Sequence, residues 1–178
     1  NICASIDGVG AVGEYIRTGL NWDQWIQNFK DGMFLLDKYG NDALVFDVTL
    51  TTPGLFDLKN LFDTVFELDV KSYFKITFAF DPSIVMSPMV LPRNILDNTI
   101  HDLLEYIEPK LTPKTYVYKE TLENMLKRPT FEEQWPDTYL ESIKNGKKNI
   151  EFLEKIRNQK ITFSEIMNDE ARDWWNTL

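Results

Sequence analysis

The chain has 178 residues, of which 43% are hydrophobic and 13% aromatic, so it is long enough and apolar enough for one domain with a packed core. Its 28 acidic and 19 basic residues give a net charge of −9, which argues against nucleic acid as a partner. No apolar run approaches the ~20 residues of a membrane span and no signal peptide is recognisable, so we expect no membrane association and a cytoplasmic location.

Residues 2–6 are predicted to form a short strand with one apolar and one polar face, because side chains alternate along a strand. The apolar face carries Ile2, Ala4 and Ile6. The other face carries Ser5 and leads to Asp7, after which Gly8 allows a sharp turn. In parallel α/β folds ligands bind at the carboxyl ends of strands, so we expect the chemistry between Ser5 and Arg17.

Alternating strands and helices follow, each marked by its own hydrophobic period. The pattern predicts helices over 21–39, 55–68 and 92–107, and strands over 43–51 and 73–80. Residues 84–91 are apolar but interrupted by proline, which indicates a loop or a short edge strand. Strands joined through helices of this length pair in parallel through right-handed crossovers. The predicted fold class is therefore α/β, with parallel βα units that form either an open sheet or a partial (half) TIM-like barrel.

The character of the chain changes after residue 109, where prolines alternate with charged helical pieces. We predict two parts, a partial βα barrel over 1–109 and a helical C-terminal appendage over 110–178. The appendage is expected to contain helices over 116–127, 131–143 and 146–157 and a last segment over 162–175. A half barrel has an exposed strand edge, so we expect either a homo-oligomer through that edge or a C-terminal segment folded over the open face.

Asp7 and Arg17 are the first candidates for a binding site. A carboxylate that points into a barrel lumen needs a partner, and the guanidinium of Arg17 can supply one. The alternative role of Asp7 is to cap the turn that follows it. Thr49 and Thr51 share the polar face of the next strand with Asp47. They are expected either to line the same cavity or to be β-forming residues bonded to their neighbours.

Three other features indicate little chemistry. The only cysteine, Cys3, and the only histidine, His101, exclude an internal disulfide and argue against a histidine-based metal site. We expect Cys3 to be buried, His101 to be exposed, and Asp47 to pair with Lys75 across strands. Residues 8–13 match the G-x-G-x-x-G dinucleotide pattern. No helix is expected to begin directly at the third glycine, which argues against NAD binding.

Two motifs together resemble the radical SAM enzymes, in particular those with a C-terminal auxiliary region of the SPASM or twitch type. One is Ser5-Ile6-Asp7-Gly8 at a strand end, followed by Tyr15-Ile16-Arg17. The other is the segment 150–159, IEFLEKIRNQ, which is similar to the segment that follows the barrel in those proteins. Residues 81–92 resemble their stretch between the last core strands. The resemblance implies that Ser5 lies at the ribose or carboxylate end of S-adenosylmethionine, and that Arg17 pairs with its carboxylate.

The chain departs from that family in one respect. The CxxxCxxC motif, whose thiolates bind the [4Fe-4S] cluster, is absent, since Cys3 is the only cysteine. We therefore expect the chain to be the second half of a SAM barrel and to be inactive alone. The resemblance implies S-adenosylmethionine as the cofactor, with the cluster present only in a full-length parent. The alternative is a non-catalytic α/β module that binds a small molecule or a protein partner.

Overall fold

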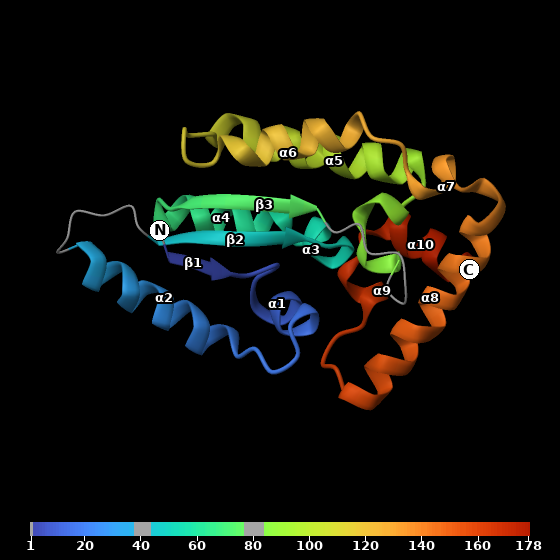
Figure 1. Ribbon diagram of the computed structural model, residues 1–178, viewed down its shortest axis with the longest axis horizontal. Coiled ribbons are helices and arrows are strands. Elements are labelled where there is room, and N and C mark those ends of the chain that lie inside the picture. The colour runs from blue at the N-terminus through green and yellow to red at the C-terminus, as the bar shows by residue number, and fades with distance from the viewer. Residues whose placement is uncertain (1, 38–43, 77–83) are drawn as a thin grey trace.

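The structure is a computed structural model that describes residues 2–37, 44–76 and 84–178. Its sheet has three parallel strands in the order β1-β2-β3 within this part of the chain. The strands are β1 (Ile2–Ser5), β2 (Leu44–Leu50) and β3 (Lys71–Ile76). Helices α1 (Gly10–Ile16) and α2 (Trp22–Asp37) connect the first pair, and α3 (Thr52–Phe56) and α4 (Leu58–Leu68) connect the second. The α/β class and the parallel open sheet are confirmed (Figure 1).

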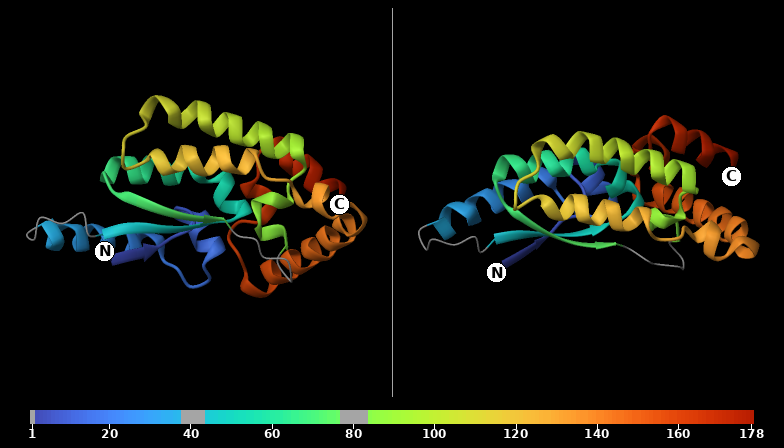
Figure 2. Two further views of the ribbon diagram at one scale, coloured as in Figure 1. Left: turned by 45° about the horizontal axis from the view of Figure 1, so that its top comes forward. Right: turned by 90° about the horizontal axis from the view of Figure 1, so that it is seen from above.

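The connecting helices cover one face of the sheet, and this is the apolar face that the alternation predicts. Trp25 and Phe29 of α2 pack edge-on against Phe46, with ring centroids 5.4 and 4.6 Å apart. Figures 1 and 2 show α4 behind the strands on the same side. Three residues of β2 are fully buried there, namely Phe46, Val48 and Leu50. The apolar period therefore decides which face receives the helices.

The opposite face of the sheet is mostly polar and partly open among the described residues, although Val45 on this face is fully buried. Ser5 is exposed, Thr49 is half-buried, and the side chain of Lys75 is 65% exposed. Cys3 lies on this face and is exposed, so the prediction of a buried cysteine was wrong. The predicted pair between Asp47 and Lys75 is confirmed, at 2.9 Å.

The C-terminal half is helical, as predicted. It contains α5 (Arg93–Ile107), α6 (Tyr116–Leu126), α7 (Phe131–Gln134), α8 (Pro136–Arg157), α9 (Phe163–Ile166) and α10 (Asp169–Thr177). Tyr118 of α6 packs on Phe74 of β3, while α8, α9 and α10 lie beyond the carboxyl ends of the strands (Figure 1). These helices do not cover the polar face, so the folding-over prediction was wrong and the homo-oligomer stays a prediction. None of the described helices combines the length and apolar character needed to cross a bilayer.

Several predicted boundaries are wrong for physical reasons. The helices expected over 131–143 and 146–157 are largely one helix, α8, which Pro136 begins. Gly146 lies inside that helix, where its missing side chain allows close packing on a neighbour. A Cβ there would lie 2.7 Å from a side-chain carbon of Val85. Residues 84–91 form two short 3-10 helices, Ile84–Met86 and Pro88–Val90, instead of a loop or strand.

The second crossover helix also differs from its prediction. Residues 52–54, which precede the helix predicted over 55–68, form the first turn of α3, and the interruption falls at Asp57. Thr51 caps α3, since its hydroxyl accepts the Gly54 N–H at 3.1 Å. Two predicted ends lie outside the described residues. They are the end of the strand predicted over 73–80 and the end of the helix predicted over 21–39. The start of the latter is confirmed, because Asn21 Oδ1 accepts the Gln24 N–H.

Candidate functional site

Asp7 lies at the carboxyl end of β1 and holds two separate donors. It is only 5% exposed. Its Oδ2 accepts the Nε–H of Arg17 at 2.8 Å, and its Oδ1 accepts the backbone N–H of Thr49 at 2.8 Å. The expected ion pair between Asp7 and Arg17 is therefore present. The same carboxylate also joins β1 to β2 just past the last paired residues of the ladder.

Arg17 remains reachable from solvent, because 38% of its side chain is exposed. A guanidinium carries five N–H donors, and the bond to Asp7 uses the one at Nε. A buried carboxylate thus orients a partly exposed cation at the edge of the sheet where parallel α/β proteins bind ligands. This arrangement can bind an anion, and a carboxylate matches the fork of the guanidinium.

The turn that carries this pair is fixed by close backbone contacts. A Cβ on Gly13 would lie 2.5 Å from the carbonyl oxygen of Gly8, and one on Gly54 would lie 2.5 Å from the carbonyl oxygen of Asp7. Asp57 Oδ2 accepts the backbone N–H of Val9 at 2.6 Å. The turn between β1 and α1 is therefore clamped onto α3, which limits where Asp7 and Arg17 can lie.

The glycine-rich turn does not have the geometry of a dinucleotide site. The helix α1 begins at Gly10, so Gly13, the third glycine, lies inside it. A side-chain carboxylate, Asp57, already bonds the Val9 N–H, where a phosphate would be expected. This contact disfavours the binding of a dinucleotide phosphate at the turn.

The five predicted site residues are brought together only in part. Asp7 and Arg17 are bonded to each other, and Thr49 contributes its backbone N–H to them. Ser5 is the last residue of β1 and is exposed on the polar face. Thr51 is 5% exposed, and its hydroxyl is used to cap α3. Thr51 lies one residue past β2, and its hydroxyl is bonded to a neighbouring backbone N–H, which favours a capping role over a ligand-lining role.

Asp57 is a site residue that sequence reasoning missed. It is 4% exposed and also accepts a hydrogen bond from the Asn60 side chain at 2.7 Å. Burial raises the pKa of its carboxyl above the ordinary value, although the bonds from Val9 and Asn60 oppose that change. An isolated acid between Phe56 and Leu58, inside an apolar stripe, was the signal that could have found it.

Asp57→Asn is expected to change how stability depends on pH. Because the folded-state pKa is raised, the folded protein holds this proton more tightly than the unfolded chain does. This tighter proton binding stabilises the folded state fully below the pKa of Asp57 in the unfolded chain, roughly 4. The stabilisation is lost as the pH rises through the pKa of Asp57 in the folded protein. Urea unfolding of both proteins at a series of pH values measures it. The free energy of unfolding of the wild type should fall relative to that of the variant as the pH rises, and a constant difference would contradict this assignment.

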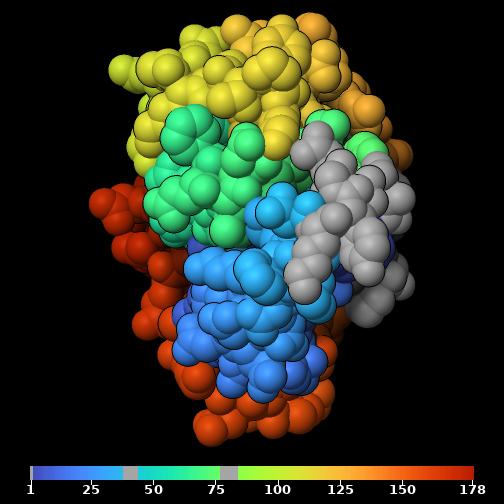
Figure 3. Space-filling view, turned by 90° about the vertical axis from the view of Figure 1, so that its left-hand side faces the viewer, coloured from blue at the N-terminus to red at the C-terminus, as the bar shows by residue number. Residues whose placement is uncertain are grey.

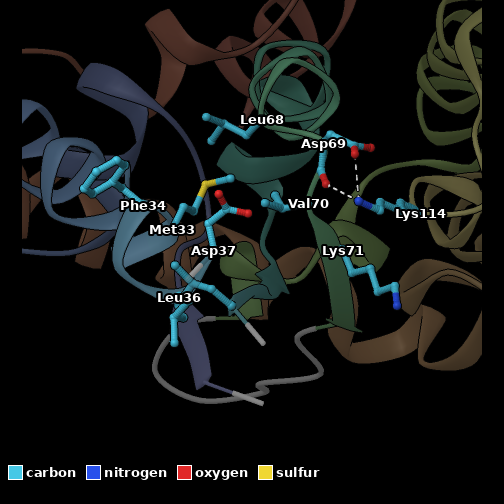
Figure 4. A pocket seen from close by; sticks show the side chains of 10 residues that line it. Met33, Phe34, Leu36, Asp37, Leu68, Asp69, Val70, Lys71 and Lys114 are labelled. Carbon is cyan, nitrogen blue, oxygen red and sulfur yellow. Dashed lines mark hydrogen bonds and ion pairs between the residues drawn. The ribbon is translucent and has the colours of Figure 1, made fainter. Parts of the chain in front are cut away.

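Two sizeable cavities lie away from Asp7 and Arg17. One, of about 390 Å³, opens at the amino ends of β2 and β3, where α2 meets α4 (Figure 3). Its wall includes Asp69, which bonds Lys114 at 2.8 Å (Figure 4). The other, of about 410 Å³, is apolar and lies between α2 and the free edge of β1. Among the described residues, no cluster of three acidic, histidine or cysteine side chains could hold a metal ion.

Comparison of the chain with protein-family models, with curated proteins and with solved structures found no match.

Proposed function

We propose that this chain is the second half of a βα barrel of the radical SAM type, in which Arg17 and Ser5 bind the methionine part of S-adenosylmethionine. The observation that carries the proposal is the pair of Asp7 and Arg17. A buried carboxylate holds a partly exposed guanidinium at the carboxyl end of a parallel strand, bonded at 2.8 Å. This is the position at which the family resemblance requires a cation for the ligand's carboxylate.

The sheet supports the half-barrel part of the proposal. Parallel sheets are normally covered on both faces, yet here Ser5, Tyr73 and Lys75 on the polar face are exposed. β1 pairs only with β2 in the described sheet, and Ile2 on β1 is 55% exposed beside the apolar cavity under α2. A further strand beside β1 would cover that edge and fill this cavity, and barrel closure would turn the polar face into a lumen lining.

The chemistry of this half would be ligand binding. Asp7 fixes the orientation of the Arg17 guanidinium, and Ser5 offers an exposed hydroxyl on the polar face. S-adenosylmethionine, when bound beside a [4Fe-4S] cluster, supplies radical chemistry in such enzymes. With one cysteine the chain does not fit a cluster of its own, so the role proposed for this half is confined to binding.

The competing proposal is a non-catalytic α/β module. One observation favours it, since both oxygens of Asp7 are already used by Arg17 and by the Thr49 N–H. The pair could then serve only to fix the turn after β1. The two proposals differ in whether Arg17 contacts a ligand.

Calorimetric titration with S-adenosylmethionine and with its demethylated analogue separates them. Arg17→Ala is expected to weaken binding by about tenfold or more, since hydrogen bonds to charged groups contribute roughly 1.5–3 kcal/mol. Lys75→Ala is the matched control, because it removes a cation from the same face of the sheet without touching Asp7. Equal binding by the wild type and Arg17→Ala, or no binding by either, would favour the non-catalytic module.

A further inference from the structure

The C-terminal helices contact the turn that carries Arg17 through one carboxylate. Glu154 lies on α8, and its Oε1 accepts hydrogen bonds from two donors. One is the hydroxyl of Tyr15 on α1, at 2.8 Å, and the other is the backbone N–H of Phe163, the first residue of α9, at 2.6 Å. A single oxygen therefore joins three helices, one from the start of the chain and two from its end.

Tyr15 is held in this position by more than its hydroxyl. Its side chain is nearly buried, at 6% exposed, and its ring packs against that of Phe163 with centroids 6.5 Å apart. The side-chain amide of Gln159 donates to the Tyr15 carbonyl oxygen at 3.4 Å. The preceding residue, Glu14, pairs with Lys160 at 3.3 Å. The segment 154–163 thus contacts the end of α1 through the side chains of Glu14 and Tyr15 and through the Tyr15 backbone.

Tyr15 stays a hydrogen-bond donor over the physiological range. Burial raises the pKa of its hydroxyl above the ordinary value, and the neighbouring Glu154 carboxylate raises it further. The bond to Glu154 is charge-assisted, which makes it stronger than a bond between neutral groups. Breaking it would remove the direct hydrogen bond between the last turn of α1 and α8.

Arg17 follows Tyr15 by two residues and ends the same helix. Its backbone N–H donates to the Gly13 carbonyl oxygen at 3.0 Å, while its side chain reaches back to Asp7. The direction of the Arg17 side chain therefore depends on the angle of the last turn of α1. Tyr15 is the residue in that turn whose side chain is fixed to the C-terminal helices.

We propose that Glu154 is a positioning residue, which fixes the end of α1 through Tyr15 and so holds the Arg17 guanidinium on Asp7. The C-terminal helices would then control the geometry of the anion-binding group at the carboxyl ends of the strands. This inference rests on the proposed function only for the identity of the ligand. The bond between Arg17 and Asp7 can be observed without any ligand.

The test measures the Nε–H of Arg17 directly. In protein with ¹⁵N-labelled arginine, this proton should exchange slowly with water while it is bonded to Asp7. Glu154→Ala is expected to speed its exchange by about tenfold, the scale of one lost hydrogen bond. Tyr15→Phe, a milder change, should have the same direction, and it keeps the test informative if Glu154→Ala does not fold.

Two control variants separate positioning from general loss of stability. Glu151→Ala removes an exposed acid from the same helix, one turn away. Tyr139→Phe removes another buried tyrosine bond of α8, to the Val90 carbonyl oxygen at 2.7 Å, far along the helix from Arg17. Both should leave the Arg17 exchange rate unchanged, even where Tyr139→Phe lowers the melting temperature.

Two results would overturn the inference. One is an Arg17 exchange rate that is unchanged in both Glu154→Ala and Tyr15→Phe. The other is a rate that rises equally in Tyr139→Phe, because Glu154 would then contribute only to overall stability. If the Glu154 and Tyr15 variants alone speed exchange but the wild type binds no S-adenosylmethionine, the positioning role stands and the proposed ligand fails.

Discussion

Gly54→Ala is expected to lower the free energy of unfolding by about 2 kcal/mol, the usual scale of overpacking in a closely packed interior. The added Cβ would lie 2.5 Å from the Asp7 carbonyl oxygen and 3.1 Å from the Thr51 hydroxyl oxygen. The first of these is a backbone atom, which cannot move without shifting the turn that carries Asp7. Because alanine favours helix more than glycine does, the clash has to outweigh a gain of up to about 1 kcal/mol.

Gly32→Ala is the matched control for this substitution. Gly32 is also helical, and a Cβ there would meet only a side-chain carbon of Leu44, at the ordinary contact distance of 3.4 Å. We expect Gly32→Ala to raise the free energy of unfolding by up to about 1 kcal/mol, since alanine is the better helix former. Urea unfolding of the two variants should therefore give changes of opposite sign. A loss in both would mean that Gly54 is not specially crowded by Asp7.

Local patterns in the sequence predicted those parts of the fold that local physics controls. The alternation along β1 and β2 identified the face that the helices cover, because strand geometry places every second side chain on one side. The pair between Asp47 and Lys75 followed from the same alternation and is confirmed at 2.9 Å. The cap at Asn21 needs only a side chain three residues before its donor.

The missed features depend on contacts between distant segments. Pro136 and Gly146 are helix breakers in isolation, but one lies in the first turn of α8 and the other lets that helix approach Val85. Asp57 and Glu154 look like ordinary acids in the sequence. Their donors, Val9 and Tyr15, lie 48 and 139 residues away. No periodicity over a short window contains such pairs.

The residues of the candidate site also separate into those that local sequence predicted and those that only the folded chain reveals. Asp7 and Arg17 were found because they are close in the sequence and follow a strand, and they are bonded. Thr51 was placed in the site by strand alternation alone. Its hydroxyl instead accepts a hydrogen bond from the first turn of α3, which begins directly after it. The groups that bond the turn after β1 and the end of α1 are Asp57, through Val9, and Glu154, through Tyr15. They come from later elements and could be found only in the folded chain.

Asp7→Ala is expected to lower the free energy of unfolding by about 3 kcal/mol, at the lower end of the cost of breaking a buried ion pair. The carboxylate is 5% exposed, and its loss leaves the Thr49 N–H without the acceptor it has at 2.8 Å. Arg17 can regain water, since 38% of its side chain is exposed, and this keeps the loss from being larger. Asp7→Asn retains an oxygen for Thr49 and should cost about half as much.

Asp47→Ala provides the comparison that isolates burial, because Asp47 also pairs with a cation on the neighbouring part of the sheet. Its partner Lys75 is 65% exposed, so the pair is screened by water and should contribute less than about 1 kcal/mol. Equal losses in Asp7→Ala and Asp47→Ala would show that the Asp7 pair is no stronger than a surface ion pair. A loss that is about 2 kcal/mol larger in Asp7→Ala than in Asp47→Ala would mean that the turn after β1 depends on Asp7. Removing one partner of a buried pair costs more than removing one partner of an exposed pair, because the remaining groups lose contacts that water does not replace.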